Sequence, residues 1–281
     1  MAADNQAFRH YSVKHRVISW LSQHLFDNLT YTVRHGLNTG MKRRGGLGWL
    51  PEFLANDTET AEQTFWRKLD LQDKVVYDVG AFHGLLTLFF ARHARTVVSY
   101  EPNTCNHARL IQNVRLNRLE NVIVRKLGVG CEFRRAVMVM DPPTPGGASI
   151  ERNIVGSKGG SNGPIVHEEI PVVRLDDDIR DASLPAPDVI KIDVEGLELA
   201  ALTGARQTIL THCPRLFIEI HGETMSLKRQ NARDVVICLE EMGYRNIRHV
   251  ESGRQVDRAT AADVAAQGHL DCVASSAPLG Q

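Results

Sequence analysis

Residues 75–84 read VVYDVGAFHG, and this stretch decides the fold of the chain. An apolar run that contains one acid, Asp78, ends at Gly80, and a second glycine, Gly84, follows shortly after. Short apolar runs bounded by glycine are typical of a buried strand that enters a turn. The stretch therefore predicts a strand that leads into a ligand-binding turn.

A second apolar run, residues 96–100, ends immediately before Glu101. The 23 residues from Asp78 to Glu101 suit a strand, a crossover helix and a second, parallel strand. In such a unit the acid at the end of the second strand lies beside the glycine turn, where it can hold a ribose diol. Asp78, Gly80 and Glu101 thus outline a site for a nucleoside cofactor.

The turn lacks the glycines of a dinucleotide fingerprint. Starting at Gly80, that fingerprint needs glycine at the positions that Phe82 and Leu85 occupy. Without these glycines a pyrophosphate group loses its closest approach to the backbone. A ligand without phosphates, such as S-adenosylmethionine, needs room for its methionine portion and an acid for its charged amine, which residues 78–84 supply. The turn favours S-adenosylmethionine, and a nicotinamide-dependent oxidoreductase is the disfavoured alternative.

Three further blocks stand apart from this turn: EPN at 101–103, KIDVEG at 191–196 and EIH at 219–221. Together with DVGA at 78–81, they resemble in order and wording the FkbM-type family of S-adenosylmethionine-dependent methyltransferases. The family usually has Asn at the position of Phe82. The resemblance implies a Rossmann-like class I methyltransferase fold whose final strand is antiparallel. It also implies O-methylation of a hydroxyl group on a small molecule, such as a sugar or a secondary metabolite.

The expected cofactor-binding residues lie at the ends of the first two strands of this fold. They are Asp78, Gly80, Ala81, Gly84, Glu101, Pro102 and Asn103. Asp78 is expected beside the amine of the cofactor and Glu101 beside its ribose. Asn103 follows Glu101 closely and is a candidate to contact the adenosine portion.

The amino-acid composition limits the classes of function that this chain can have. The chain has 281 residues, of which 43% are hydrophobic, so it can bury one sizeable core. Lys plus Arg and Asp plus Glu each total 33, so no global field favours a nucleic acid or an anionic membrane. No apolar run approaches the ~18 residues of a membrane span, and the five cysteines form no Cys-x-x-Cys pair. These features predict a soluble cytoplasmic protein with a small-molecule acceptor, and they do not indicate an oligomeric state.

Alternating strand and helix patterns predict one α/β domain over residues 61–281, with a doubly wound, mainly parallel seven-stranded sheet. Strands are expected at 75–79, 96–100, 121–127, 188–193, 216–221, 244–250 and 270–275. Helices are expected at 58–69, 84–93, 104–117, 197–211 and 230–242. The alternation predicts helices on both faces of the sheet.

Two segments lie outside this alternation. Residues 131–175 hold two β-like runs, 136–140 and 169–175, around a loop dense in glycine and proline, and they predict an exposed insertion. Residues 1–60 predict an N-terminal helical and loop extension, with an amphipathic helix at 12–29. A glycine-rich stretch at 36–48 carries Lys42, Arg43 and Arg44 and predicts a basic loop.

The expected catalytic residues follow later strands of the sheet. Asp193 and His221 fall at predicted strand ends, as Asp78 and Glu101 do, and ligand crevices in open α/β sheets lie at the carboxyl ends of the strands. Methyl transfer to a hydroxyl requires alignment of the acceptor oxygen and loss of its proton. His221 is the first choice as general base, because imidazole titrates near neutral pH.

Asp193 and Glu195 are the alternative catalytic residues. In an extended segment they face one side, where they serve as a base with an orienting group or as two oxygen ligands of a divalent cation such as Mg²⁺. The pattern does not decide whether a metal takes part, and a helix cap is the simpler interpretation of either acid. Lys191 lies on the same face and is a candidate to neutralise Asp193. A methyltransferase-like scaffold without turnover is the remaining function class, with Phe82 as the mark of a remodelled pocket.

Overall fold

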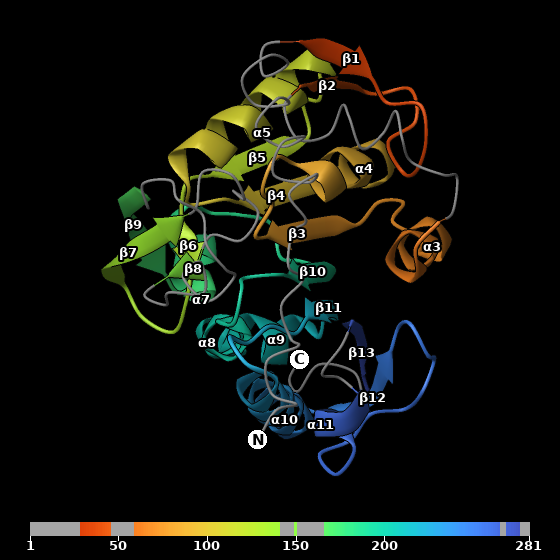
Figure 1. Ribbon diagram of the computed structural model, residues 1–281, viewed down its shortest axis with the longest axis vertical. Coiled ribbons are helices and arrows are strands. Elements are labelled where there is room, and N and C mark those ends of the chain that lie inside the picture. Colours follow the sequence, from red (N-terminus) through yellow and green to blue (C-terminus); the bar gives the residue numbers. More distant parts are fainter. Residues whose placement is uncertain (1–28, 46–58, 141–148, 151–165, 265–267, 276–281) are drawn as a thin grey trace.

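The computed structural model describes residues 29–45, 59–140, 149–150, 166–264 and 268–275 (Figure 1). The helix expected at 12–29 falls outside the described residues, apart from Leu29. Most of the loop expected within 131–175 also falls outside them.

A seven-stranded sheet forms the centre of the molecule. Its strands in spatial order are β12 (Tyr244–His249), β13 (His269–Ala274), β11 (Arg215–Glu219), β10 (Val189–Ile192), β3 (Val75–Val79), β4 (Thr96–Tyr100) and β5 (Val122–Arg125). β13 runs antiparallel to both of its neighbours, and the other adjacent strands are parallel. The mainly parallel, doubly wound sheet and its antiparallel final strand are therefore confirmed. The strand order reverses between β3 and β10, which is where such sheets place their ligand crevice.

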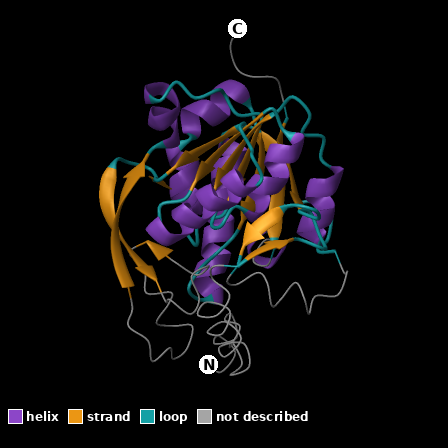
Figure 2. Ribbon diagram, turned by 90° about the horizontal axis from the view of Figure 1, so that it is seen from above, coloured by secondary structure: helices purple, strands orange, loops and turns teal. Residues whose placement is uncertain are grey.

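Helices cover both faces of the sheet (Figure 2). One face is covered by α8 (Glu198–Gly204), α9 (Arg206–His212) and α10 (Met225–Glu241), whose apolar side chains share a buried cluster with Tyr77. Val76, the next residue along β3, faces a second cluster with α3 (Ala61–Lys68) and α4 (Leu85–His93). Because β3 is buried on both faces, its sequence reads as a continuous apolar run. The single helix expected at 197–211 is divided into α8 and α9 at Ala205.

Three further helices complete the described part of the fold. They are α5 (Thr104–Leu116), α7 (Leu175–Asp181) and α11 (Ala261–Val264). None of the helices in the described ranges combines the length and the apolar character that crossing a bilayer requires. The five cysteines all lie within the described residues and are free thiols.

The insertion is more regular than its sequence predicts, because it forms a sheet of its own. This sheet has the order β6 (Gly128–Val129), β9 (Val166–Val173), β7 (Arg134–Met140) and β8 (Ser149–Ile150). Alternate residues of β7 and β9 point inward, so that Ala136, Met138, Ile170 and Val172 form a small buried cluster. The second β-like run ends at Val173 rather than at residue 175, because α7 begins at Leu175.

The basic stretch near the N-terminus is a strand rather than a loop. β1 (Thr30–Thr32) and β2 (Lys42–Arg44) pair antiparallel. The backbone N–H groups of Lys42 and Arg44 donate to the side chains of Asn117 and Asn113, both at 2.8 Å. These asparagines lie on or just after α5, so the helix satisfies the free edge of β2. Arg43, between Lys42 and Arg44 in the sequence, is buried.

Candidate active site

The glycine turn after β3 touches the segment that follows β10. Gly80 has a φ of 83°, and a β-carbon at this position would lie 1.8 Å from the backbone oxygen of Asp193. Any other residue would be strained and would also collide with that carbonyl group. The ammonium group of Lys191 donates to the backbone oxygen of Gly80 at 2.9 Å. The predicted cofactor turn and Asp193 therefore belong to one site.

Glu101 follows β4 and is 5% exposed. Its Oε2 accepts from the backbone N–H of Phe82 at 2.8 Å, and its Oε1 accepts from that of Asn103 at 2.9 Å. Burial raises the pKa of Glu101 to about 7, although these two hydrogen bonds offset part of the effect. The side chain of Asn106 is a third donor to this carboxylate. A carboxylate has about four acceptor positions, so one is left for a ribose hydroxyl. This geometry fits the role predicted for Glu101.

Phe82 adopts a backbone conformation that its residue type disfavours. Its φ is 52°, in the left-handed region that Asn enters more readily than a bulky residue does. This conformation gives a physical reason for Asn at the corresponding position of the family. In this chain the ring of Phe82 stacks on His83 with 3.7 Å between ring centroids, while its N–H is held by Glu101.

Asp78 is almost fully buried and is held by neighbours within the protein. Its Oδ2 accepts from the hydroxyl of Thr87 at 2.6 Å, and its Oδ1 lies 3.3 Å from Nζ of Lys191. The same Nζ lies 3.3 Å from Oδ2 of Asp193, so Lys191 neutralises Asp193 as the sequence predicts. Burial lowers the pKa of Lys191, but the charges of Asp193 and Asp78 outweigh burial and raise it. Asp78 thus acts on the turn through Lys191, and its direct contact with a cofactor amine stays a prediction.

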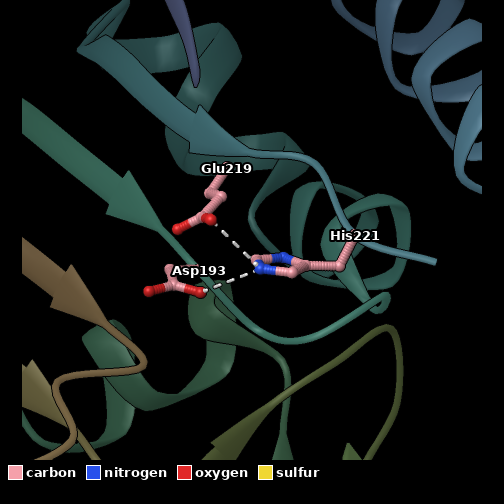
Figure 3. A group of neighbouring side chains, drawn as sticks. All are labelled: Asp193, Glu219 and His221. Carbon is pink, nitrogen blue, oxygen red and sulfur yellow. Dashed lines mark ion pairs between the residues drawn. The ribbon is translucent and has the colours of Figure 1, made fainter. Parts of the chain in front are cut away.

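A histidine and two carboxylates meet on the other side of the switch point. His221 follows the end of β11, and Figure 3 shows the carboxylates of Asp193 and Glu219 pointing toward the same edge of its ring. Nε2 of His221 lies 3.4 Å from Oε1 of Glu219 and 3.8 Å from Oδ1 of Asp193. These three side chains each present one atom that could bind a metal ion.

The opposite edge of the His221 ring faces Glu198, in the first turn of α8. Nδ1 of His221 lies 2.9 Å from Oε1 of this fully buried carboxylate, which also accepts from the side chain of Asn231 at 2.6 Å. Burial lowers the pKa of His221, but the hydrogen bonds to Glu198 and Glu219 outweigh burial and raise it well above its usual value. The ring must therefore lose a proton before it can act as the general base that the sequence predicts.

The expectation that Asp193 and Glu195 share one side of an extended segment is wrong. β10 ends at Ile192, and Glu195 has a φ of 51° in a turn that leads into α8. Glu219 takes the place beside Asp193 instead, and it was not among the predicted site residues. The EIH block holds the signal, because Glu219 ends β11 and His221 follows two positions later, and both side chains line the same pocket.

A pocket of about 480 Å³ opens over these strand ends. The predicted site residues that line it are Asp78, Gly80, Ala81, Glu101, Pro102, Asp193, Glu195 and His221. The volume falls within the range of ~300–1,000 Å³ that is usual for small-molecule sites. The polar lining also includes Lys191, the predicted partner of Asp193, and residues that the sequence did not single out for the site, namely His35, Asn38, Glu62, Gln63 and Glu219.

Two predicted cofactor residues, Gly84 and Asn103, support the pocket without lining it. Gly84 is the N-cap of α4, and a β-carbon there would lie 2.4 Å from Cδ1 of Leu110. Asn103 is the N-cap of α5 and accepts from the backbone N–H of Asn106 at 2.9 Å. Its amide group donates to Glu168 at 2.7 Å. Gly84 and Asn103 therefore cap the helices that follow β3 and β4.

Several known proteins resemble this chain. The FkbM methyltransferase from Methylobacillus flagellatus KT is 23% identical, with 71% of this chain and 43% of that chain covered and a TM-score of 0.45. A putative rRNA methylase from Clostridium thermocellum is 11% identical, with 79% and 99% covered and a TM-score of 0.46. Precorrin-6y C5,15-methyltransferase from Geobacter metallireducens GS-15 is 14% identical, with 66% and 72% covered and a TM-score of 0.41. This chain spans less than half of the Methylobacillus protein.

The family assignment comes from a sequence profile. No curated protein matches the chain. The profile of the family described as Methyltransferase FkbM domain matches residues 78–246. This match covers more than half of the 281 residues and includes every predicted site residue from Asp78 to His221. The chain belongs to the FkbM methyltransferase domain family.

Proposed function

We propose that this protein is an S-adenosylmethionine-dependent methyltransferase that methylates a hydroxyl group of a small molecule, such as a sugar or a secondary metabolite. The observation that carries the proposal is a single pocket lined both by Glu101 and by the cluster of His221 and Asp193. Glu101 follows β4 and His221 follows β11, three strand spacings apart, which corresponds to about 14 Å. A nucleoside and an acceptor can therefore lie side by side in this pocket.

The residues at the Glu101 end fit the cofactor. Glu101 keeps acceptor capacity for a ribose hydroxyl, and Phe82 and Pro102 add apolar surface that suits a purine. Gly80 has no side chain, so the backbone of the turn is open to the methionine portion. Bound there, S-adenosylmethionine supplies a sulfonium methyl group, whose carbon–sulfur bond breaks with its electron pair left on sulfur as the acceptor oxygen takes the methyl carbon.

The residues at the other end fit a hydroxyl-bearing acceptor. Asp193, Glu195 and His221 are the proposed catalytic residues, because they present polar groups that can orient a hydroxyl and assist the loss of its proton. Orientation at a near-attack distance of about 3–3.5 Å can supply much of the rate enhancement. The wall also includes Arg43 from the N-terminal segment and Met138 from the insertion, so parts of the chain outside the central sheet also shape the pocket.

Charge and cysteine chemistry support the proposed context of the reaction. A formal net charge of zero supports a small-molecule acceptor without a nucleic-acid or membrane partner. Five free cysteines support a reducing, cytoplasmic environment.

Calorimetric titration with S-adenosylmethionine, S-adenosylhomocysteine and NAD tests the cofactor class. We expect the first two ligands to bind and NAD not to bind, and we expect Glu101→Gln to weaken binding at least about tenfold, since the ribose loses a charged acceptor. Binding of NAD alone would contradict the proposal. Binding of S-adenosylmethionine without turnover on any hydroxyl acceptor would support the scaffold alternative instead.

A further inference from the structure

We propose that Asp193, Glu219 and His221 form a binding site for a divalent first-row transition-metal ion that holds the acceptor hydroxyl. The inference rests on the proposed function, and it names how that site activates its acceptor. One ligand atom from each of the three side chains lies within 4.8 Å of the other two. Glu219 is the last residue of β11 and His221 follows it two positions later, whereas Asp193 follows the adjacent strand β10.

The separations within this group match the coordination of a small cation. Ligands about 2.1 Å from a tetrahedral metal ion lie about 3.4 Å apart, and octahedral neighbours lie about 3.0 Å apart. Nε2 of His221 is 3.4 Å from Oε1 of Glu219 and 3.8 Å from Oδ1 of Asp193. Small side-chain rotations would bring both oxygens to coordination distance, and no backbone movement is needed.

Each of the three side chains is held from behind by a second residue. Nδ1 of His221 faces Glu198, Oδ2 of Asp193 faces Lys191, and Oε2 of Glu219 lies 3.5 Å from Nε2 of His269. In each of the three side chains, one polar atom faces a neighbouring protein residue and another faces the position proposed for the cation.

Carboxylate–histidine–metal arrangements of this type are the usual outer shell of protein metal sites. Glu198 is suited to that position because it is fully buried and is fixed by the backbone N–H of Gly196 at 2.9 Å and by Asn231 at 2.6 Å. The ring of His221 is thus oriented before any ligand arrives. Its Nε2 edge is directed at the two carboxylates.

The inner atoms face space that a substrate can enter. Asp193, Glu219 and His221 all line the pocket, and their side chains are 30%, 36% and 17% exposed. A site with three protein ligands leaves coordination positions open, as in catalytic rather than structural metal centres. These open positions face the same cavity as Glu101.

The donor set indicates which cation fits. Carboxylate oxygens suit Mg²⁺, Ca²⁺ and Mn²⁺, whereas imidazole nitrogen suits Zn²⁺, Fe²⁺ and other first-row ions. One imidazole with two carboxylates therefore favours an ion such as Mn²⁺ or Fe²⁺ over Mg²⁺, which the sequence pattern had left open. A cation at this position binds the acceptor hydroxyl and lowers its pKa. The O–H bond then breaks with its electron pair left on oxygen, and the proton passes to water in the open pocket.

Titration with Mn²⁺ after removal of metals by a chelator tests this inference, with free Mn²⁺ measured by electron paramagnetic resonance. We expect one Mn²⁺ per chain in the unaltered protein and weaker binding of Mg²⁺. Glu219→Gln and Asp193→Asn should each weaken Mn²⁺ binding at least about tenfold, and Glu198→Gln should weaken it about 10–100-fold through the orientation of His221. Glu169→Gln, at an exposed ion pair on β9, is the matched control and should leave binding unchanged.

S-adenosylmethionine binding is measured on the same samples, so that the two proposals can fail separately. Glu219→Gln should retain cofactor binding, which also shows that the variant is folded. Cofactor binding and methyl transfer by metal-free protein, with no stoichiometric Mn²⁺ uptake, would overturn the metal site and leave the proposed function intact. Equal Mn²⁺ affinity in the unaltered protein and both ligand variants would also overturn it. Stoichiometric Mn²⁺ binding without cofactor binding would support the site and contradict the proposed function.

Discussion

Glu198 and His221 form a hydrogen bond of 2.9 Å that joins the first turn of α8 to the segment after β11. The carboxylate is fully buried, whereas the ring that it holds lines the pocket. A buried charge is tolerated when every oxygen has a partner, and Glu198 has three donors: Gly196, His221 and Asn231. The orientation of His221 is therefore set by the core of the protein rather than by a ligand.

Glu198→Ala should lower the free energy of unfolding by about 2–4 kcal/mol, because it removes the buried carboxylate that three hydrogen-bond donors share. Urea denaturation followed by circular dichroism measures this change. Glu169→Ala removes an exposed partner of Arg135 and should cost less than about 1 kcal/mol. Equal losses in the two variants would contradict a special role for the buried carboxylate.

Gly80→Ala should destabilise the protein by about 3 kcal/mol or more and abolish cofactor binding, because the new β-carbon collides with the backbone of Asp193. Gly243→Ala is the matched control, since Gly243 has a similar φ of 88° with open space around it. That control should cost about 1–2 kcal/mol from backbone strain alone. Thermal unfolding and calorimetry distinguish the two variants, and similar losses in both would show that the turn and Asp193 are not in contact.

Affinity for S-adenosylmethionine should fall as the pH drops below about 7. Burial raises the pKa of Glu101 to about 7, and ribose hydroxyls donate to the ionised carboxylate, so protonation competes with binding. Below this pKa, the dissociation constant should rise by up to about tenfold per pH unit. Calorimetry at pH 6, 7 and 8 measures the change. Glu101→Gln should show a flat profile over this range, and an unchanged slope in that variant would assign the dependence to another group.

Lys191→Met should destabilise the protein by about 3–5 kcal/mol, because it leaves the carboxylate of Asp78 buried without its ion-pair partner. Asp78→Asn in the same chain should restore part of the loss, since the buried negative charge is then removed as well. A double-mutant cycle by chemical denaturation gives the coupling between the two residues. Additive losses would mean that Lys191 acts mainly through Asp193. Lys74→Met, at an exposed pair with Asp188, should change stability by less than about 1 kcal/mol.

His221→Asn should retain cofactor affinity within about twofold and slow methyl transfer by about 100-fold or more, because His221 lies at the acceptor end of the pocket. Calorimetry measures the first quantity, and formation of S-adenosylhomocysteine measures the second once an acceptor is known. Turnover at the unaltered rate would remove His221 from the catalytic residues. Loss of cofactor binding would move it to the cofactor side.

Local sequence was sufficient to predict the central sheet. β3 and β4 begin and end at the predicted residues, because continuous apolar runs between glycines and polar residues are short-range signals. The position of Gly80 in a turn after the first strand, and that of Glu101 at the end of the second strand, were predicted for the same reason. Their spacing along the chain is itself the length of one βαβ unit.

The insertion and the N-terminal strand pair were predicted less well. The strands of the insertion pair across a long segment, and β2 is stabilised by Asn113 and Asn117 of a distant helix end. Such contacts join residues far apart in sequence, so a local sequence pattern does not predict them. The basic, glycine-rich stretch at 36–48 is therefore predicted to be a loop, although part of it forms the strand β2.

Local sequence patterns were enough to indicate the family, the parallel core and the strand ends near which Asp78, Glu101, Asp193 and His221 lie. Tertiary structure decided the partners of these residues. Lys191 holds Asp78 and Asp193 together, Glu198 orients His221, and Glu219 replaces Glu195 beside Asp193. Periodicity along a chain reports which side of a strand a residue faces, whereas distances between side chains depend on strand order, on turns such as that at Glu195, and on burial.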